Sequence, residues 1–326
     1  MRIRSAFVPI LALLMPVSAV SGGFGKLPVS ARAVTFGGMM VALQDDPNAL
    51  FVNPAAIGSL SGVHLSTSFT KLFPGVTDDN LSYISGSAVA NIGFAGNIGV
   101  GIKAFRSQSW TEGELIGSYA QSLFDLITVG GSAKFLYWSA AAPAGRLAVP
   151  EPGFSSTTLS FDAGAQIRFN NVVQDNDIVA GLSVRDITRP SIVSNTPFAV
   201  EASKRVGTRS ELETSAKLDI GYAAGVTYIS RSLNYLAALG ISKVGDVDRF
   251  TIGVEIQAAK GEFMGQPVAF TLRAGGGRSS RPIVQDDLFG GFGVEISGIT
   301  LDYAFGQPTQ IQGLSGTHHI TLRTSF

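Results

Sequence analysis

The chain has 326 residues, 24 basic and 24 acidic side chains, 45% hydrophobic residues and no cysteine. The lack of cysteine excludes disulfide scaffolds, thiolate zinc sites and cysteine nucleophiles. Nucleic-acid binding needs an excess of basic residues, and because the charges balance, no nucleic-acid partner is expected. Charged residues make up 15% of the chain, well below the roughly 25% of ordinary soluble domains.

The first residues are typical of a secretory signal peptide. Arg2 and Arg4 precede an apolar stretch over residues 6–17, and small residues mark a cleavage site after Ala19. Two prolines interrupt this short stretch, so an uncleaved anchor helix is the less favoured alternative, and we predict a signal peptide over residues 1–19. No later run approaches the roughly 18 to 20 apolar residues of a membrane helix. These features favour a transmembrane β-barrel or a secreted all-β protein.

Residues 20–60 are predicted to form a small helical segment. In its first part, apolar side chains recur at helical spacing, although two adjacent glycines interrupt the pattern. Asp46 can cap a short helix that begins at Pro47, and Asn53 can cap another that begins at Pro54, since proline fits the first helical position. A segment of about 40 residues is too small to fold alone. We therefore expect it to pack against a wall, which the lumen of a barrel would provide.

Residues 61–326 alternate between apolar and polar residues in the manner of β-strands. Fourteen such segments are separated by clusters of Gly, Asn, Asp, Pro and Ser. An even number of strands is typical of a bacterial barrel whose N- and C-termini both face the periplasm. We predict an all-β fold, a transmembrane antiparallel β-barrel of about 14 strands with a small N-terminal helical plug, in the outer membrane of a Gram-negative-type cell. Two long connections, near 139–156 and 187–215, are expected on the outer side and carry apolar residues for a ligand groove.

The charges inside the predicted strands share one face. In residues 158–169, for example, Asp162 and Arg168 lie on the face opposite the large apolar side chains. This pattern favours a barrel lumen over a soluble β-sandwich, because a lipid-facing Arg or Lys at mid-bilayer costs about 2 to 4 kcal/mol. We expect these charges to form ion pairs that join wall and plug, and a cationic cluster for a ligand carboxylate is the sharper alternative. The predicted lumen charges are Lys103, Lys134, Asp162, Arg168, Arg185, Lys217, Asp219, Glu255, Arg273, Glu295, Asp302 and Arg323.

Two stretches resemble bacterial outer-membrane proteins. The last residues, HHITLRTSF, resemble the C-terminal recognition strand of such proteins, which an aromatic residue such as Phe326 closes. Residues 31–60, ARAVTFGGMMVALQDDPNALFVNPAAIGSL, resemble the N-terminal signature of the FadL-type outer-membrane transporter superfamily, especially its PorV/PorQ-like branch. In that signature a paired-acid turn and an Asn-Pro-Ala step precede the first strand. The matching positions are Asp45, Asp46, Asn53, Pro54 and Ala55.

The resemblance implies an N-terminal plug that gates a fourteen-stranded barrel. FadL-type transporters move long-chain fatty acids or other hydrophobic compounds, so the expected function is passive uptake of a hydrophobic small-molecule ligand, with membrane lipid as a further partner. PorV-type members act in type IX secretion, so binding of a secreted protein or translocon is the alternative. In the FadL-type scheme a break in the third strand offers lateral exit. Glycine in a strand often marks a bend, and the candidate positions for this opening are Gly93, Gly96, Gly99 and Gly101.

Catalysis has little support in the sequence. The histidines are His64, His318 and His319, and the last two point to opposite faces of a strand, which argues against a two-His metal site. No convergent Ser/His or Asp/His set can be placed, as a lipase or protease would need. We therefore expect no catalytic residues, cofactor or metal, and an outer-membrane enzyme is the least favoured of the three functions.

Overall fold

The structure is a computed structural model that describes part of the chain. The described residues are 24, 28–76, 79–124, 126–141, 153–173, 175–193, 217–281, 287–309, 313 and 315–326. The predicted signal peptide lies outside them, as do most residues of the two long connections predicted on the outer side.

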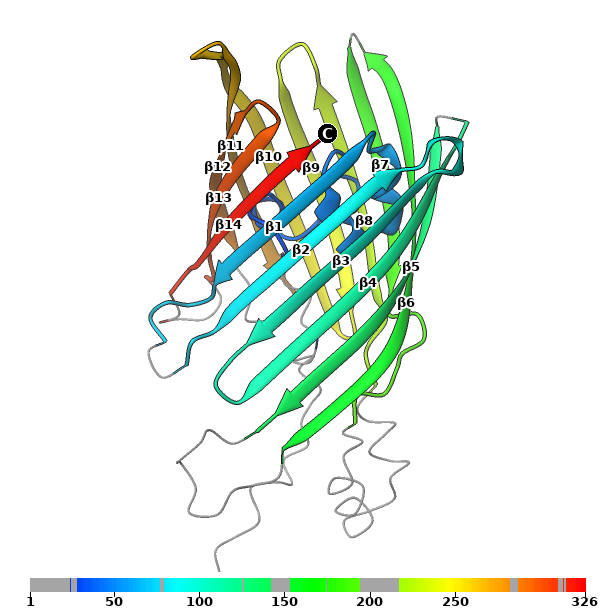
Figure 1. Ribbon diagram of the computed structural model, residues 1–326, viewed down its shortest axis with the longest axis vertical. Coiled ribbons are helices and arrows are strands. Elements are labelled where there is room, and N and C mark those ends of the chain that lie inside the picture. Colours follow the sequence, from blue (N-terminus) through cyan, green and yellow to red (C-terminus); the bar gives the residue numbers. More distant parts are fainter. Residues whose placement is uncertain are drawn as a thin grey trace, which may run out of the picture.

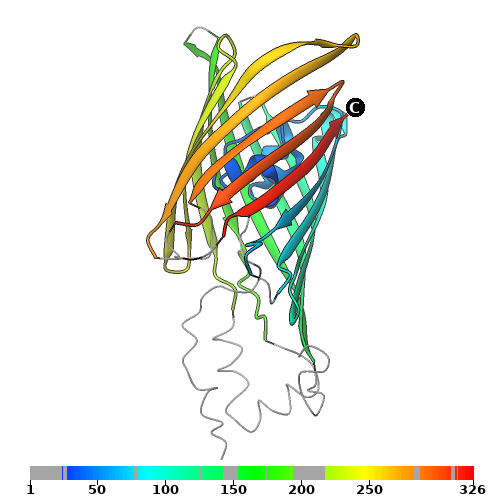
Figure 2. The same ribbon diagram turned by 90° about the vertical axis from the view of Figure 1, so that its left-hand side faces the viewer.

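Within the described residues, fourteen antiparallel strands form one closed barrel, which confirms the fold class (Figures 1 and 2). Each strand pairs with its neighbours in the sequence, and β1 pairs with β14 to close the sheet. The strands are β1 (Val63–Lys71), β2 (Ser82–Asn91), β3 (Asn97–Arg106), β4 (Trp110–Leu123), β5 (Ile127–Ala140), β6 (Phe154–Val173), β7 (Asn176–Arg185), β8 (Gly221–Ser230), β9 (Tyr235–Val244), β10 (Val247–Phe263), β11 (Gln266–Ser279), β12 (Leu288–Ile296), β13 (Ile299–Gln307) and β14 (Thr317–Ser325).

Large apolar side chains cover the outside of the barrel. On β3, for example, Ile98, Val100 and Ile102 are each about half exposed, whereas the intervening glycines face inward. A continuous belt of this kind would be unfavourable in water. Around a closed barrel it is the surface that faces lipid, with charges kept to the lumen.

The hairpin formed by β10 and β11 is longer than the sequence pattern predicts. The turn between these strands is made by Met264 and Gly265, whose φ angles are 53° and 75°, as in a two-residue hairpin of the type I′ class. Residues 258–267 are exposed on both faces of this hairpin. Alternation is lost where both faces meet solvent, and for this reason the sequence suggests a long connection instead.

The segment before β1 lies inside the barrel (Figure 2). It contains α1 (Ala31–Thr35) and two 3-10 helices, η2 (Pro47–Phe51) and η3 (Pro54–Ser59). The two helices that begin at proline are therefore as predicted, whereas the first helix is shorter than its apolar spacing suggests. It ends because Gly37 and Gly38 adopt positive φ angles of 65° and 82°. None of the described helices is long and apolar enough to cross a membrane.

The two ends of the described chain lie at opposite ends of the barrel. The N–H of Phe326 donates to the carbonyl oxygen of Val63, at the start of β1, at 2.9 Å, and we call this end the C-terminal end. The N–H of Phe24 donates to Oε2 of Glu112 at 2.7 Å, near the start of β4 and thus at the opposite end. At Phe24 the chain therefore lies on the other side of the plug from Phe326, and the orientation of the N- and C-termini relative to the membrane stays a prediction.

Candidate functional site: the plug and its seat in the lumen

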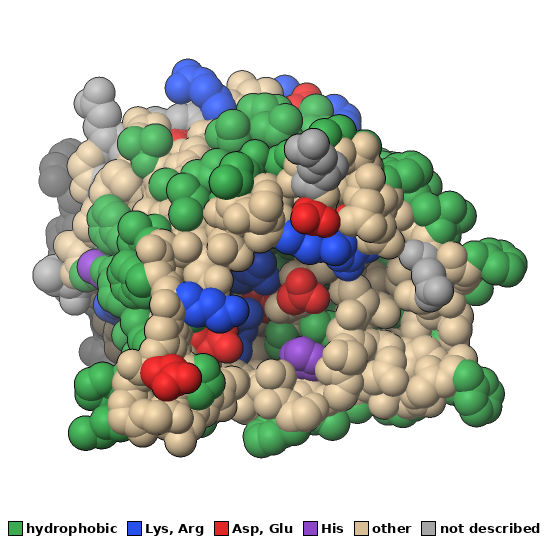
Figure 3. All heavy atoms as spheres, turned by 90° about the horizontal axis from the view of Figure 1, so that it is seen from above, with side chains coloured by type: hydrophobic (Ala, Val, Ile, Leu, Met, Phe, Trp, Pro, Cys, Tyr) green, Lys and Arg blue, Asp and Glu red, His purple; other side chains and the backbone are tan. Residues whose placement is uncertain are grey.

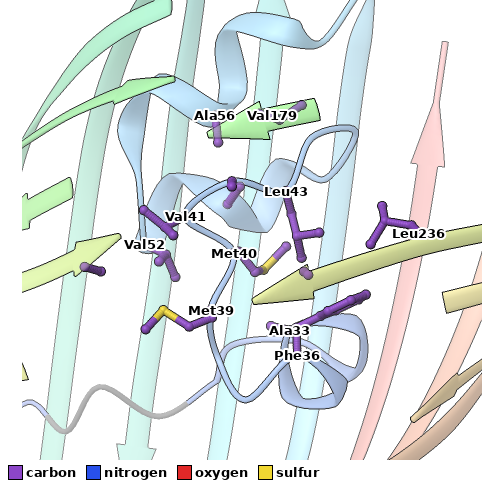
Figure 4. Close-up of a cluster of buried hydrophobic side chains, with 14 residues drawn as sticks. Ala33, Phe36, Met39, Met40, Val41, Leu43, Val52, Ala56, Val179 and Leu236 are labelled. Carbon is purple, nitrogen blue, oxygen red and sulfur yellow. The ribbon is translucent and has the colours of Figure 1, made fainter. Parts of the chain in front are cut away.

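The plug, residues 28–60, and the barrel wall share a buried apolar core (Figure 4). Met40 and Leu43 of the plug have no exposed area, and they cluster with Val179 of β7 and Leu236 of β9. A second cluster of plug and wall residues contains Val29, Leu50, Phe51, Ile57, Leu60, Tyr83, Val89, Ile116 and Ala120. Displacing the plug would expose apolar surface on both partners, so hydrophobic burial holds the plug in its seat.

Asn53 joins the cap of a plug helix to the rest of the plug and to the wall. Its Oδ1 accepts a hydrogen bond from the N–H of Ala55 at 3.0 Å, which caps η3. Its Nδ2 donates to the carbonyl oxygens of Val41 at 2.6 Å and of Ala165, on β6, at 3.4 Å. This side chain is fully buried, so these bonds compensate the loss of water around its amide group.

The Asn-Pro-Ala step lies on two glycines of the wall. Gly130 of β5 and Gly164 of β6 are partners in the strand register. A Cβ on Gly130 would lie 2.6 Å from the backbone nitrogen of Ala55, and a Cβ on Gly164 would lie 1.9 Å from Oδ1 of Asn53. A larger residue at either wall position would push the plug away, so the step and the two glycines fit together as a pair.

The paired acids before η2 have different roles. Asp45 is exposed and forms a turn with a positive φ of 60°. Asp46 is fully buried, and its Oδ1 accepts bonds from the N–H and the Nδ2 of Asn48, both at 2.9 Å, which caps η2. Asn48 in turn donates to Oγ of Ser66 on β1 at 2.9 Å. The second acid of the pair is therefore the one that fixes the plug to the wall.

Six charged side chains form a closed ring between plug and wall, which we call the latch ring. Its members are Arg32 and Asp46 of the plug, Glu255 on β10, Arg273 on β11, Asp302 on β13 and Arg323 on β14. Arg32 donates to both carboxylate oxygens of Glu255, at 2.8 and 3.0 Å. Two contacts of 3.8 Å, from Arg32 and from Arg323, reach Oδ2 of Asp46 and close the ring.

The wall completes the ring through shorter contacts. Arg273 donates to Glu255 at 2.5 Å and to Asp302 at 2.6 Å. Arg323 donates to the other oxygen of Asp302 at 2.9 Å. Charges of opposite sign alternate around the whole ring, so each charge has an opposite charge on either side. The ring therefore fits the expectation that lumen charges join wall and plug, and it adds the two plug residues that supply the link.

The latch ring is shielded from solvent. Its side chains are at most 18% exposed, and buried charges persist only when they are paired. Burial alone would lower the pKa of Arg32, but Glu255 and Asp46 raise this pKa above its usual range. The guanidinium of Arg32 therefore remains charged inside the lumen, as the ring requires.

Other predicted lumen charges pair between neighbouring strands. Lys134 on β5 lies 2.7 Å from Asp162 on β6 and 2.6 Å from Asp186, just after β7. Lys103 on β3 lies 2.9 Å from Glu114 on β4. The contacts of Lys134 stay within the wall, whereas Nζ of Lys103 also lies over the ring of Phe51 in the plug, 5.7 Å from its centroid.

Two arginines lie near opposite ends of β7. Arg168 on β6 donates to Oε1 of Gln44 in the plug and to Oδ2 of Asp177, both at 2.7 Å, and so links plug and wall near the C-terminal end. Arg185 ends β7 near the opposite end, and its Nε is buried with no hydrogen-bond partner among the described residues.

Three predicted lumen charges lie outside the closed part of the lumen. Lys217 and Asp219 precede β8, which begins at Gly221 and not at residue 216 as the alternation suggests. Glu295 is exposed near the end of β12. The alternation of polar and apolar residues continues into these positions, although they do not lie on the wall around the plug.

Sequence reasoning missed several charges that face the lumen. These residues are Arg32, Glu112, Glu114, Asp177 and Asp186. Arg32 lies in the plug, where no strand pattern assigns a face, and the only available signal was a basic residue in an otherwise apolar stretch. Within the described residues, no group of three or more His, Asp and Glu side chains could hold a metal ion.

The four glycines predicted for a lateral opening lie in two places. Gly93 and Gly96 lie in the turn before β3, with φ angles of 69° and 90°. Gly99 and Gly101 face the plug, and a Cβ on Gly101 would lie 2.6 Å from the ring of Phe51. Along β3, which is described in full, pairing with β2 and β4 continues without a register shift. The structure therefore shows no break in this strand, and the two inner glycines make room for the plug.

The C-terminal end of the lumen is polar. Figure 3, viewed from this end, shows acidic and basic side chains gathered around a central hollow. The charges near this end include Asp177, whose Oδ2 accepts hydrogen bonds from Arg168 and Arg231. A hydrophobic molecule that moved straight through the barrel would meet this charged mouth after passing the apolar core of the plug.

A closed, lipid-facing barrel of fourteen strands with an N-terminal plug in its lumen is a plugged outer-membrane barrel. Solved structures share this fold at low sequence identity. The toluene transporter TbuX of Ralstonia pickettii is 14% identical with a TM-score of 0.61, over 93% of this chain and 100% of that one. The toluene transporter TodX of P. putida is 11% identical with a TM-score of 0.58, over 93% and 99%.

A third structure, a FadL homologue of Pseudomonas aeruginosa, is 12% identical with a TM-score of 0.55, over 93% of this chain and 100% of that one. No family model matches the chain, and no curated protein matches it by sequence. The likeness therefore establishes a fold shared with FadL-type barrels, in agreement with the resemblance of residues 31–60. The narrower PorV/PorQ-like assignment stays a prediction.

Proposed function

We propose that this chain is an outer-membrane barrel for the passive uptake of hydrophobic small molecules and that the plug is its gate. The observation that carries the proposal is the apolar core shared by plug and wall. At the level of residues 39–43, the plug meets the wall mainly through apolar side chains and glycine backbone, and Gln166 on β6 adds hydrogen bonds to the carbonyl oxygens of Val41 and Leu43. A path opened here by movement of the plug would be lined mainly by carbon. Such a path suits a molecule that gains free energy by leaving water.

The fold likeness supports the same class of substrate. Two of the similar structures are toluene transporters, and a third is a FadL homologue. Small hydrocarbons and fatty-acid-like molecules are therefore the first ligands to test for this chain. The burial of the plug fits a gate, since an open water-filled pore would offer such ligands little gain.

The function can be tested by fixing the plug to the wall with a disulfide. The Cβ of Ala42 lies 3.8 Å from the position that a Cβ on Gly225, in β8, would occupy, which is the typical Cβ separation in a disulfide. The chain has no cysteine, so the variant Ala42→Cys/Gly225→Cys contains a single pair. The side chain of Val41 must shift to admit the new residue, since its Cγ1 lies 2.7 Å from that position.

The measurement is uptake of labelled toluene and of a labelled long-chain fatty acid by proteoliposomes, with and without reductant. We expect oxidation to reduce uptake and reductant to restore it. The control variant is Ser118→Cys/Ser132→Cys, because these wall residues face each other across β4 and β5 with hydroxyls 2.8 Å apart. Its disulfide should leave uptake unchanged. Equal uptake by the oxidised and reduced plug variant, or rapid entry of sugars into the unmodified proteoliposomes, would contradict the proposal.

The alternative functions remain predictions. Binding of a secreted protein or translocon would use the long outer connections, and most of their residues lie outside the described part of the chain. A pulldown from native membranes that recovers such a partner would favour it. An enzyme would require hydrolysis of lipid or peptide that is lost on mutation of a lumen residue.

A further inference from the structure

An apolar groove crosses the outer wall of the barrel from β6 to β10 and has a volume of about 470 Å³. Ala180 on β7 and Ala224 on β8 lie in it, on the face of the wall that points away from the lumen. Larger side chains flank them, among them Leu182, Val226 and Leu239, which are 62%, 47% and 50% exposed. The groove is therefore a depression in the lipid-facing belt, made by small side chains among large ones.

Three glycines lie directly behind the groove on the lumen face. Gly181 on β7, Gly225 on β8 and Gly240 on β9 follow one another in register across the sheet. A Cβ on Gly181 would lie 2.1 Å from the carbonyl oxygen of Val41, and a Cβ on Gly240 would lie 2.5 Å from Cγ of Met39. The plug therefore rests on the bare backbone of the wall, and it supports the wall at the place where the groove is hollowed.

The position of the groove identifies its occupant as a hydrocarbon chain from the membrane. The groove is continuous with the belt of exposed apolar side chains around the barrel, so the same bilayer that faces the belt also covers the groove. Its volume lies within the range of about 300 to 1,000 Å³ that is common for small-molecule sites. An unfilled depression would lose dispersion contacts on one side, and a flexible acyl chain can follow its irregular floor.

We propose that this groove is a specific site for one acyl chain of a membrane lipid. The site is formed in advance, because the paired strands and the plug behind them fix its shape. An acyl chain that lies on a convex part of the belt is contacted by the protein on one side only. An acyl chain in the groove is contacted by residues of several strands. The proposal rests on the fold and the outer surface and is independent of the uptake function.

The test uses the full chain in lipid nanodiscs that contain a trace of phospholipid with a diazirine in one acyl chain. After illumination, labelled residues are mapped by mass spectrometry. We expect labelling on the groove strands at least about fivefold above that on the lipid face of β13 and β14, where Leu301 and Ile320 are similarly exposed. Such a ratio corresponds to a preference of about 1 kcal/mol.

Filling the groove should remove this preference. The variant Ala224→Phe places a ring in the groove, and Ala180→Leu is a second filling variant that adds less bulk. The matched control is Ala133→Phe, because Ala133 is a lipid-facing alanine on β5 that does not line the groove. We expect labelling to fall to the background of β13 and β14 in the two filling variants, and to persist in the control.

Several results would overturn the proposal. Uniform labelling around the belt would mean that lipid covers the wall without a site, and labelling that survives both filling variants would place the chain elsewhere. Crosslinks between two barrels at this wall would make a second copy the occupant. Labelling by a free diazirine fatty acid that excess phospholipid does not reduce would assign the groove to a transported ligand instead.

Discussion

The latch ring makes a quantitative prediction for the change Arg32→Met. Methionine keeps an extended side chain but removes two hydrogen bonds to Glu255 and one to the carbonyl oxygen of Gln44. Breaking a buried ion pair costs about 3 to 5 kcal/mol when it leaves a charge unpaired. Here Glu255 keeps Arg273 and Asp46 keeps Arg323. We therefore expect the lower end, about 3 kcal/mol, lost from the docking of the plug.

The assay measures how often the plug leaves its seat. The chain has no cysteine, so the background variant Ala49→Cys carries a single thiol at a position of η2 that has no exposed area. A maleimide can react with this thiol only after the plug has moved. A loss of about 3 kcal/mol corresponds to a labelling rate roughly 100-fold higher in the Arg32→Met variant.

The matched control is Lys243→Met. It removes an exposed ion pair of the wall, in which Nζ of Lys243 lies 3.2 Å from Oδ1 of Asp248. This change should leave the labelling rate within about twofold, because exposed pairs contribute little. Raising the salt concentration should not reproduce the effect, since buried pairs are poorly screened. A rise below about threefold in Arg32→Met, or an equal rise in the control, would refute the reasoning that the ring holds the plug.

Three further changes test the seat of the plug with the same labelling assay or with conductance. Gly181→Ala places a Cβ against the carbonyl oxygen of Val41, so the rate of maleimide labelling at Ala49→Cys should rise at least tenfold, which corresponds to roughly 1.4 kcal/mol. The control Gly261→Ala, which has open space around its Cβ, should leave this rate unchanged. Asn53→Ala removes the cap of η3 and a hydrogen bond to the wall and should weaken the docking of the plug by about 1 to 2 kcal/mol. An unchanged labelling rate would count against a role of Asn53 in holding the plug. Deleting residues 31–58 should leave a folded barrel that conducts ions across a planar bilayer, and an unfolded or non-conducting product would contradict the description of a separate plug.

The strand count and the caps could be predicted because each depends on local pattern. Period-two alternation defines strands wherever one face meets lipid and the other meets a filled lumen. Asp46 and Asn53 directly precede prolines, and this pattern alone predicts where η2 and η3 begin. The same reasoning fails at the tip of the hairpin of β10 and β11. Both faces of the sheet are exposed there, so the sequence does not alternate between apolar and polar residues.

The seat of the plug could not be predicted because it depends on register across the barrel. Gly130 and Gly164 are far apart in the sequence and become a pair through the alignment of β5 and β6. The latch ring likewise joins Arg32 to Glu255, 223 residues away. Nothing local distinguishes these glycines and charges from others in the chain, so their roles appear only once the sheet has closed.

The pairing of β1 with β14 has a consequence for the order of assembly. The plug directly precedes β1, and the N–H of Ala31 donates to Oγ1 of Thr321 on β14 at 2.8 Å. The strand β14 thus supplies both the closing edge of the barrel and part of the surface on which α1 rests. Seating of that helix therefore depends on closure of the barrel, and a chain truncated within β14 loses both together.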